Sequence, residues 1–306
     1  MASFDYDVLV VGSGFGGSVT ALRLTEKGYR VGVIEAGRRF DTSTLPKTSW
    51  DLRRFLWAPG LGMRGIQRIT PLKDIAILSG AGVGGGSLVY ANTLYEPLEP
   101  FYTDKQWGHI TDWKAELAPY YDQAKRMLGV NEVPADTPPD KYMHELADRL
   151  GVSDTYHRTP VGVWFGKAGQ RVEDPYFGGE GPDRVGCTHC GSCMVGCRIG
   201  AKNTLDKNYL YLAEKRGLEV RTEAEVVHVA PLPGGEPGSN GYRIETLEGL
   251  PPGRRKSERY EAQRVIFSGG VMGTVDLLLR LREDAILRRE LDDPAKVHHR
   301  DPRSEE

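Results

Sequence analysis

Three short segments of this 306-residue chain are rich in glycine, so their backbone can approach a ligand closely. The first, GSGFGG at positions 12–17, matches the G-x-G-x-x-G pattern of dinucleotide-binding turns. In such a turn Gly12 permits the tight bend, Gly14 lets the backbone approach a diphosphate, and Gly17 allows close packing of helix on strand. The order of these glycines predicts a phosphate-binding turn at the head of a helix.

An acidic residue, Glu35, ends the apolar run that follows this helix. A carboxylate in this place can accept hydrogen bonds from ribose hydroxyls, and it would repel the 2′-phosphate of NADP. The fingerprint with Glu35 predicts a dinucleotide site but does not separate FAD from NAD. A glycine-rich turn that binds no ligand is the alternative.

Two further glycine segments lie later in the chain. GAGVGGGS, at positions 80–87, holds too little side chain to pack, which favours a backbone surface against a flat or charged ligand. A flexible surface loop is the alternative. Ser268-Gly269-Gly270 falls between a buried strand and a helix and repeats the arrangement of the first motif. A nucleotide domain assembled from distant segments favours FAD, because a nicotinamide dehydrogenase completes its nucleotide domain in one continuous stretch.

The four cysteines form one run, C-x₂-C-x₂-C-x₃-C, from Cys187 to Cys197. Its spacing is that of a bacterial ferredoxin segment, with Arg198 in place of the usual proline. A single four-iron cluster would need all four thiolates from this one loop, or another ligand such as His189. A tetrahedral zinc site and a set of free thiols without metal are the alternatives. The sequence therefore does not decide whether these cysteines bind a metal, or which one.

Composition excludes several classes of protein. Lys and Arg number 40 against 42 acidic residues, a net charge of −2, which gives no electrostatic reason to expect a nucleic-acid partner. We find no secretory signal and no apolar run of about 18 residues, so we predict a cytoplasmic protein without a transmembrane segment. Cysteines confined to one loop are not typical of a disulfide framework.

The elements that position these motifs alternate between strand and helix. A buried strand over 7–11, a helix that ends at Gly28, and a strand over 30–34 form a βαβ unit. Later patterns predict helices over 113–128 and 204–215, a strand over 219–229, a hairpin near 242–244, and a strand over 265–267 that leads into an apolar helix. The fold class predicted is α/β, an FAD-binding, Rossmann-like, doubly wound domain.

Strand–helix alternation is lost in the middle of the chain, which suggests an insertion. We predict the first part of the FAD-binding domain at 1–97 and an inserted α+β cap or substrate-domain segment at 98–180. The returning part of the FAD-binding domain, with the cysteine loop, spans 181–282. A charged tail at 283–306 is predicted to be disordered.

Together these segments resemble the glucose–methanol–choline (GMC) oxidoreductases, and within them the cholesterol-oxidase-like branch. The similar stretches cover most of residues 5–282 and include DYDVLVVGSGFGGSVTALRL, GAGVGGGSLVYANTLYEP, ITDWKAELAPYYDQAKRMLGV, GCRIGAKNTLDKNYLYLAE and VIFSGGVMGTVDLLLRL. Tyr90 departs from the pattern, because many members have Asn there, beside the flavin. The similarity ends after Arg282, so the resemblance implies a fold that is incomplete at its C-terminus.

This resemblance implies an FAD-dependent oxidoreductase that oxidises the CH–OH group of an alcohol, with a sterol as candidate substrate and peripheral membrane contact left open. It places the FAD diphosphate, ribose, flavin and adenine along three glycine segments and one later strand. The implied cofactor-binding residues are Gly12, Ser13, Gly14, Gly16, Gly17, Glu35, Gly84, Gly85, Ser87, Val226, Ser268 and Gly269.

In members of this family the catalytic base, a His paired with His or Asn, lies in the C-terminal part. None of the seven histidines matches that motif, so catalytic residues stay unassigned: His109, His144, His157, His189, His228, His298 and His299. We therefore expect a truncated chain, or one part of a split gene, that is not a competent oxidase alone. The alternatives are a non-catalytic FAD-binding fragment and a flavin dehydrogenase that uses an iron–sulfur centre.

Overall fold

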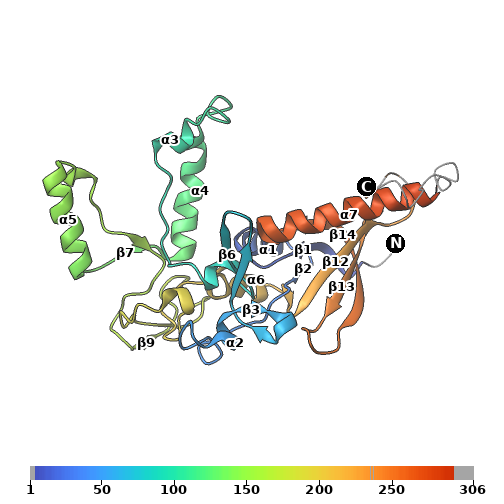
Figure 1. Cartoon of the computed structure of the whole chain (residues 1–306), viewed down its shortest axis with the longest axis horizontal. Coiled ribbons are helices and arrows are strands. Elements are labelled where there is room, and N and C mark those ends of the chain that lie inside the picture. The colour runs from blue at the N-terminus through green and yellow to red at the C-terminus, as the bar shows by residue number, and fades with distance from the viewer. Residues whose placement is uncertain (1–3, 235, 237, 293–306) are drawn as a thin grey trace.

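A six-stranded sheet forms the centre of the computed structural model, which describes residues 4–234, 236 and 238–292 (Figure 1). The strand order is β11-β2-β1-β14-β13-β12, with parallel pairing from β11 to β14 and antiparallel pairing from β14 to β12. The strands are β1 (Tyr6–Val11), β2 (Val31–Ile34), β11 (Glu219–Arg221), β12 (Ala224–Pro231), β13 (Tyr242–Glu248) and β14 (Lys256–Phe267).

β1 lies in the parallel part of the sheet and confirms the predicted first strand. Val8 and Val10 point to one face and Leu9 to the other, and all three are buried. Val10 lies opposite Val33 of β2 and Ile266 of β14. A strand that is covered on both faces explains why its sequence is a continuous apolar run rather than an alternating one.

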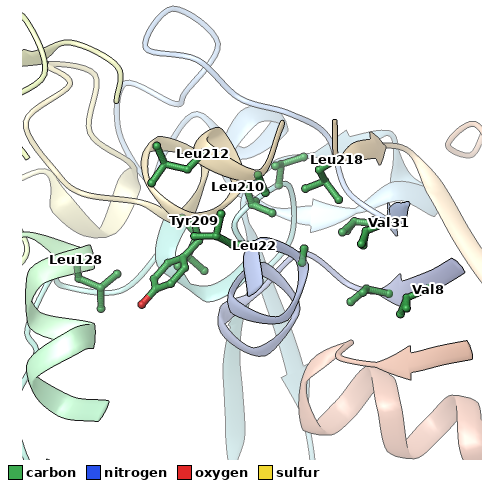
Figure 2. Packing of buried hydrophobic residues seen from close by; sticks show 14 residues of the cluster. Val8, Leu22, Val31, Leu128, Tyr209, Leu210, Leu212 and Leu218 are labelled. Carbon is green, nitrogen blue, oxygen red and sulfur yellow. The ribbon is translucent and has the colours of Figure 1, made fainter. Parts of the chain in front are cut away.

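Helices cover both faces of the sheet, which confirms the predicted α/β class. On one face α1 (Phe15–Glu26) and α6 (Tyr209–Glu214) pack on β1 and β2; Figure 2 shows Leu22, Tyr209 and Leu210 in this core. On the other face Leu277 of α7 (Gly270–Asp292) packs in a cluster with Leu9 and the β12–β14 meander.

Between β2 and the second glycine loop the chain leaves the sheet and forms a short helix and two small hairpins. These elements are α2 (Leu52–Phe55), β3 (Trp57–Ala58), β4 (Met63–Arg64), β5 (Gln67–Pro71) and β6 (Ala76–Gly80). β3 pairs with β4 and β5 pairs with β6. The β5–β6 hairpin leads directly into the second glycine loop and therefore fixes where that loop starts.

The inserted segment carries helices that project away from the sheet (Figure 1). Its α4 has the predicted bounds, whereas α5 was not predicted, although Thr137 and Asp140 form a capping box at its start. α4 buries only Leu128, and α5 buries no residue. The elements are α3 (Glu99–Tyr102), α4 (Trp113–Leu128), β7 (Asn131–Glu132), α5 (Pro138–Leu150), β8 (Pro160–Val161) and β9 (Arg171–Val172). Strand β10 (Arg184–Val185), which pairs with β9, follows just after the end of the inserted segment.

Several predicted elements differ from the structure in their extent, and the strand expected over 265–267 is only the last part of β14. The helix expected over 204–215 is broken, because Asn208 adopts a non-helical conformation and its side chain caps the N–H of Tyr209. The strand expected over 219–229 is two strands, separated at Glu223, whose φ is +55°. Helix α7 continues to Asp292, into the segment expected to be disordered; the rest of that segment, including His298 and His299, lies outside the described residues.

Candidate functional site

A cavity of about 670 Å³ lies at the carboxyl ends of the parallel strands, where the three glycine segments meet. Ligands of open α/β sheets bind at this edge. Of the residues predicted to bind a cofactor, the structure places these on the cavity wall: Gly12, Ser13, Gly14, Gly16, Glu35, Gly85, Val226, Ser268 and Gly269. Gly17, Gly84 and Ser87 are not among its lining residues.

The head of α1 opens into this cavity. Gly14 is the N-cap of the helix, and no side chain caps it. A β-carbon added to Gly14 would meet no atom within 4 Å, so the backbone here borders open space. The unpaired N–H groups and the positive end of the helix dipole are therefore available to an anion such as a diphosphate.

Two other glycines of the first motif hold the turn against its neighbours. Gly12 has φ +98°, and an added β-carbon would lie 2.5 Å from the carbonyl oxygen of Ser268. At Gly17 an added β-carbon would lie 2.0 Å from the carbonyl oxygen of Gly12. Gly17 thus has the packing role that its place in the motif predicts, and it lies behind the wall of the cavity.

Glu35 also lines the cavity, and its buried carboxylate joins the first two glycine loops. Oε2 accepts hydrogen bonds from the N–H and the hydroxyl of Ser13, at 3.1 and 2.6 Å. Oε1 accepts from the N–H groups of Gly37 and Gly82, at 2.8 and 3.3 Å. The carboxylate fixes the shape of the cavity wall in addition to any contact with a ribose.

The second glycine loop packs backbone to backbone on the first. An added β-carbon at Gly85 would lie 2.7 Å from the Cα of Gly14, so only glycine fits there. Gly84 donates its N–H to the hydroxyl oxygen of Ser13 at 3.1 Å. Ser87 donates to the carbonyl of Gly84 at 2.7 Å and accepts from the N–H of Leu205 at 3.0 Å. Gly84 and Ser87 therefore support this wall from behind, whereas Gly85 forms its surface.

Tyr90, which follows this loop, is also set back from the cavity. Its hydroxyl donates to the carbonyl oxygen of Asn203 at 2.9 Å, and its ring meets that of Phe15 edge-on at 6.1 Å. Burial raises the pKa of the Tyr90 phenol, so the hydroxyl stays protonated and remains a donor. Phe15 does line the cavity, which places Tyr90 one layer of side chains behind it.

Sequence patterns did not reveal several cavity residues, because all of them except Phe15 come from segments without a glycine motif. The guanidinium of Arg68 lies 5.9 Å from the ring centre of Trp57. Arg255 donates from Nη2 to Glu225 Oε2 at 2.7 Å. The missed lining residues with polar or aromatic side chains are Phe15, Trp57, Arg68, Ser79, Glu225, Arg255, Asp276 and Arg280.

The acidic groups that line the cavity each have a partner. Glu35 holds the glycine loops, Glu225 pairs with Arg255, and Asp276 pairs with Arg280 at 3.0 Å. No histidine is among the described residues that line the cavity. The wall can bind and orient a nucleotide, but within the described chain it offers no uncommitted proton acceptor.

The predicted cysteine loop lies outside this cavity. Its four cysteines line a second, much smaller cavity together with Lys202.

No helix in the described part of the chain is both long and apolar enough to cross a membrane.

Two family models match the sequence. The model described as GMC oxidoreductase matches residues 180–281, and that of an NAD(P)-binding Rossmann-like domain matches residues 10–48. One solved structure, of a formate oxidase from Aspergillus oryzae RIB40, superposes with a TM-score of 0.53 at 14% identity. That alignment covers 91% of this chain and 48% of the oxidase and shows similarity of fold alone.

Several curated proteins are similar in sequence. A cholesterol oxidase from Mycobacterium tuberculosis is 56% identical over 285 residues, which cover 91% of this chain and 48% of the relative. A cholesterol oxidase from Acinetobacter baumannii is 43% identical, with 95% and 53% covered. A 2-methyl-1,2-propanediol dehydrogenase from Mycolicibacterium austroafricanum is 26% identical, with 89% and 50% covered. The chain thus spans about half the length of each of these relatives.

Proposed function

Because the chain belongs to the GMC oxidoreductase family, we propose that it binds FAD in the cavity at the head of α1. One observation carries the proposal. Glycine segments around Gly12, Gly85 and Ser268, far apart in sequence, form one wall beside an uncapped helix N-terminus. A nucleotide site assembled in this way is suited to a long dinucleotide that crosses the edge of the sheet.

The residues have separate tasks in this proposal. The N–H groups at the head of α1 bind the diphosphate, with Gly14 allowing the close approach. Glu35 holds the ribose in addition to the two loops. Gly85 offers backbone to the flavin, and Val226 offers backbone to the adenine.

We assign the chain to an enzyme that oxidises the CH–OH group of an alcohol, with a sterol as the substrate. The sterol is supported by the name cholesterol oxidase, which two relatives at 56% and 43% identity share. Bound FAD would supply the acceptor for the hydride of the alcohol carbon. The chain's own residues hold that acceptor and exclude water from one of its faces.

A second candidate function is FAD binding without turnover by this chain alone. It is favoured by the state of the cavity's acidic groups, since Glu35, Glu225 and Asp276 all have partners. Removal of the hydroxyl proton requires a base within hydrogen-bonding reach. Under this second candidate function, the 306-residue chain binds the cofactor but does not oxidise alcohols unaided.

The decisive experiment uses the purified chain without added cofactor. Released FAD, identified by mass spectrometry, and saturable FAD binding would support the proposal; failure to bind FAD, with NAD bound instead, would overturn it. Anaerobic addition of cholesterol then separates the two candidates. Bleaching of the flavin band assigns catalysis to this chain, whereas an unchanged band with FAD bound assigns it the binding role.

We also propose a cytoplasmic location. Peripheral contact with a lipid surface is part of the same proposal, because a sterol substrate resides in membranes. The exposed apolar side chains Leu72 and Ile75, at the tip of the β5–β6 hairpin, are suited to such contact. Co-sedimentation with phosphatidylcholine–cholesterol vesicles tests it. The wild-type chain should bind more strongly than a Leu72→Glu, Ile75→Glu variant, and equal binding would contradict the proposal.

A further inference from the structure

The cysteine loop forms a site of its own beside the nucleotide cavity. Cys187, Cys190, Cys193 and Cys197 all line one small cavity, and none of them is in a disulfide. Its first residue is anchored by a hydrogen bond from the N–H of Cys187 to the carbonyl of Trp164 at 2.9 Å. One loop of 11 residues therefore brings all four cysteines to the wall of one cavity, which the spacing alone left open.

The backbone of this loop bends sharply at three positions, and two nearby N–H groups are directed at its sulfur atoms. His189, Gly191 and Gly196 have φ values of +54°, +70° and +83°, which produce successive sharp bends. The N–H of His189 points at Cys187 Sγ at 3.4 Å, and that of Lys202 at Cys197 Sγ at 3.5 Å. Backbone N–H groups directed at sulfur are one means by which proteins adjust cluster potentials.

His189 does not complete the ligand set. Its ring stacks on Phe165, with 5.8 Å between centroids and 18° between planes, and it does not line the small cavity. The fourth thiol, Cys197, does line it. The donor set is therefore four sulfurs rather than three sulfurs and one nitrogen.

The arrangement does not suit a single ion. Zinc requires every ligand to converge on one atom, at about 2.3 Å for sulfur. Within the described chain no three His, Cys, Asp or Glu side chains are placed to hold one metal ion. A four-iron cluster has a different requirement, because each thiolate binds a different iron and the sulfurs surround the cluster instead of meeting at its centre.

Buried positive charge lies directly against the loop. Lys202 is completely buried, and its ammonium donates to the carbonyls of Leu88, Tyr90 and Cys193 at 3.1, 2.9 and 2.9 Å. All three of these acceptors are neutral carbonyls, so no carboxylate is hydrogen-bonded to the ammonium, although the charge of Asp206 acts on it from nearby. A buried cation is costly without a compensating anion. A cluster held by four thiolates carries net negative charge and would supply it.

From the shared cavity, the inward N–H groups, the unsuitability for one ion and the buried ammonium, we propose that Cys187, Cys190, Cys193 and Cys197 bind an iron–sulfur cluster. The site is separate from the FAD cavity but close to it. Lys202 Nζ lies 4.6 Å from the ring centre of Tyr90, and Tyr90 packs on Phe15, which lines the larger cavity. Flavin and cluster absorb in overlapping regions, so a test must measure iron and sulfide as well as colour.

The test uses the whole chain, purified without oxygen from cells supplied with iron. Metal analysis should give about four iron and about four acid-labile sulfide per chain, the content of a [4Fe–4S] cluster. Dithionite should produce the electron paramagnetic resonance signal of a reduced cluster. Zinc without sulfide, or a chain free of metal after anaerobic reconstitution with ferrous iron and sulfide, would overturn the proposal.

Variants separate ligation from folding. Cys193→Ser should lose most of the iron and sulfide while the circular dichroism spectrum is kept, and Cys197→Ser should do the same. Met194→Ala is the matched control, because this side chain belongs to the same loop and is 52% exposed. Full iron content in both cysteine variants would refute ligation by this loop. The wild-type metal analysis decides the proposal independently if a variant fails to fold.

Discussion

The hydroxyl of Ser13 donates a 2.6 Å hydrogen bond to the carboxylate of Glu35 and accepts one of 3.1 Å from the N–H of Gly84. A residue inside the first glycine motif thus joins the end of β2 to the second glycine loop. The nucleotide fingerprint is therefore not a free-standing turn. Its shape depends on a carboxylate and on a loop 71 residues later in the chain.

Glu35→Gln should destabilise the fold. The carboxylate accepts from four donors, whereas the glutamine amide has one acceptor oxygen and would turn an NH₂ group toward N–H donors. We expect the free energy of unfolding to fall by about 1–3 kcal/mol. Urea denaturation of the purified chain measures this. Glu245→Gln, which breaks an exposed pair with Arg259, should change it by less than about 1 kcal/mol; equal losses in both variants would contradict the assignment.

Gly14→Ala and Gly17→Ala should have opposite consequences. The first methyl group enters open space, so the free energy of unfolding should change little while the dissociation constant for FAD rises about tenfold or more, which is at least about 1.4 kcal/mol. The second methyl group would collide with the carbonyl oxygen of Gly12 and should destabilise the chain by about 1–3 kcal/mol. Urea denaturation and FAD titration together check the pair. Unchanged FAD affinity in Gly14→Ala would argue against a diphosphate at the head of α1.

Tyr6 should make stability fall at alkaline pH. Burial raises the pKa of its phenol to about 12, while the phenol donates to Glu219 at 2.6 Å and accepts from Arg221 at 3.1 Å. Between pH 10 and 12 the folded chain keeps a proton that the unfolded chain has lost. The contribution of the Tyr6 phenol to the free energy of unfolding is therefore complete below pH 10. It is lost as pH rises toward 12, with a slope of at most about 1.4 kcal/mol per pH unit.

Tyr6→Phe is the variant that checks this pH dependence. It cannot ionise, so its free energy of unfolding should fall less steeply than that of the wild type when urea denaturation is repeated from pH 9 to 11. Tyr260, whose pKa burial also raises, is present in both chains, and the charge of Tyr6 is the smallest of the causes that shift its pKa. Parallel pH profiles for the two chains would show that Tyr6 does not titrate as described.

Lys202→Met should destabilise the chain even though it removes a buried charge. Methionine leaves the carbonyls of Leu88 and Tyr90 without this donor, and leaves that of Cys193 with only the N–H of Gly196. Each unsatisfied buried acceptor costs about 1–3 kcal/mol, which outweighs the relief from desolvation of one ammonium, and we expect a net loss of roughly 3 kcal/mol. Lys167→Met, at an exposed position, should be neutral in the same urea experiment. A stabilised Lys202→Met chain would show that desolvation dominates.

Local patterns were sufficient where sequence neighbours decide the structure. The β1–turn–α1–β2 unit follows from apolar runs and glycine order, and α4 from its capping residue Asp112 and the glycine after Leu128. The break at Asn208 could not be predicted in the same way. Whether an asparagine side chain caps a new helix or continues an old one depends on the packing around it.

The residues that form the cavity wall could likewise be predicted only in part from local sequence patterns. In a loop with almost no side chains there is no alternation to indicate which residue faces a ligand, so Gly85 could not be distinguished from Gly84. Trp57, Arg68 and Arg255 reach the cavity only because the β3–β6 hairpins and the meander fold toward it. Their positions follow from tertiary contacts, which no local spacing encodes.

Helix α5 buries none of its 13 residues, in contrast to β1, where Leu9 and Val10 are completely enclosed. Helices shorter than about 12–15 residues are marginal in water when nothing packs on them. Backbone amides of α5 should therefore exchange with deuterium by local fraying, whereas those of β1 should exchange only when the whole sheet opens. The backbone amides should therefore form a fast-exchanging group in α5 and a slowly exchanging group in the sheet, and the sheet is the part that carries the glycine loops.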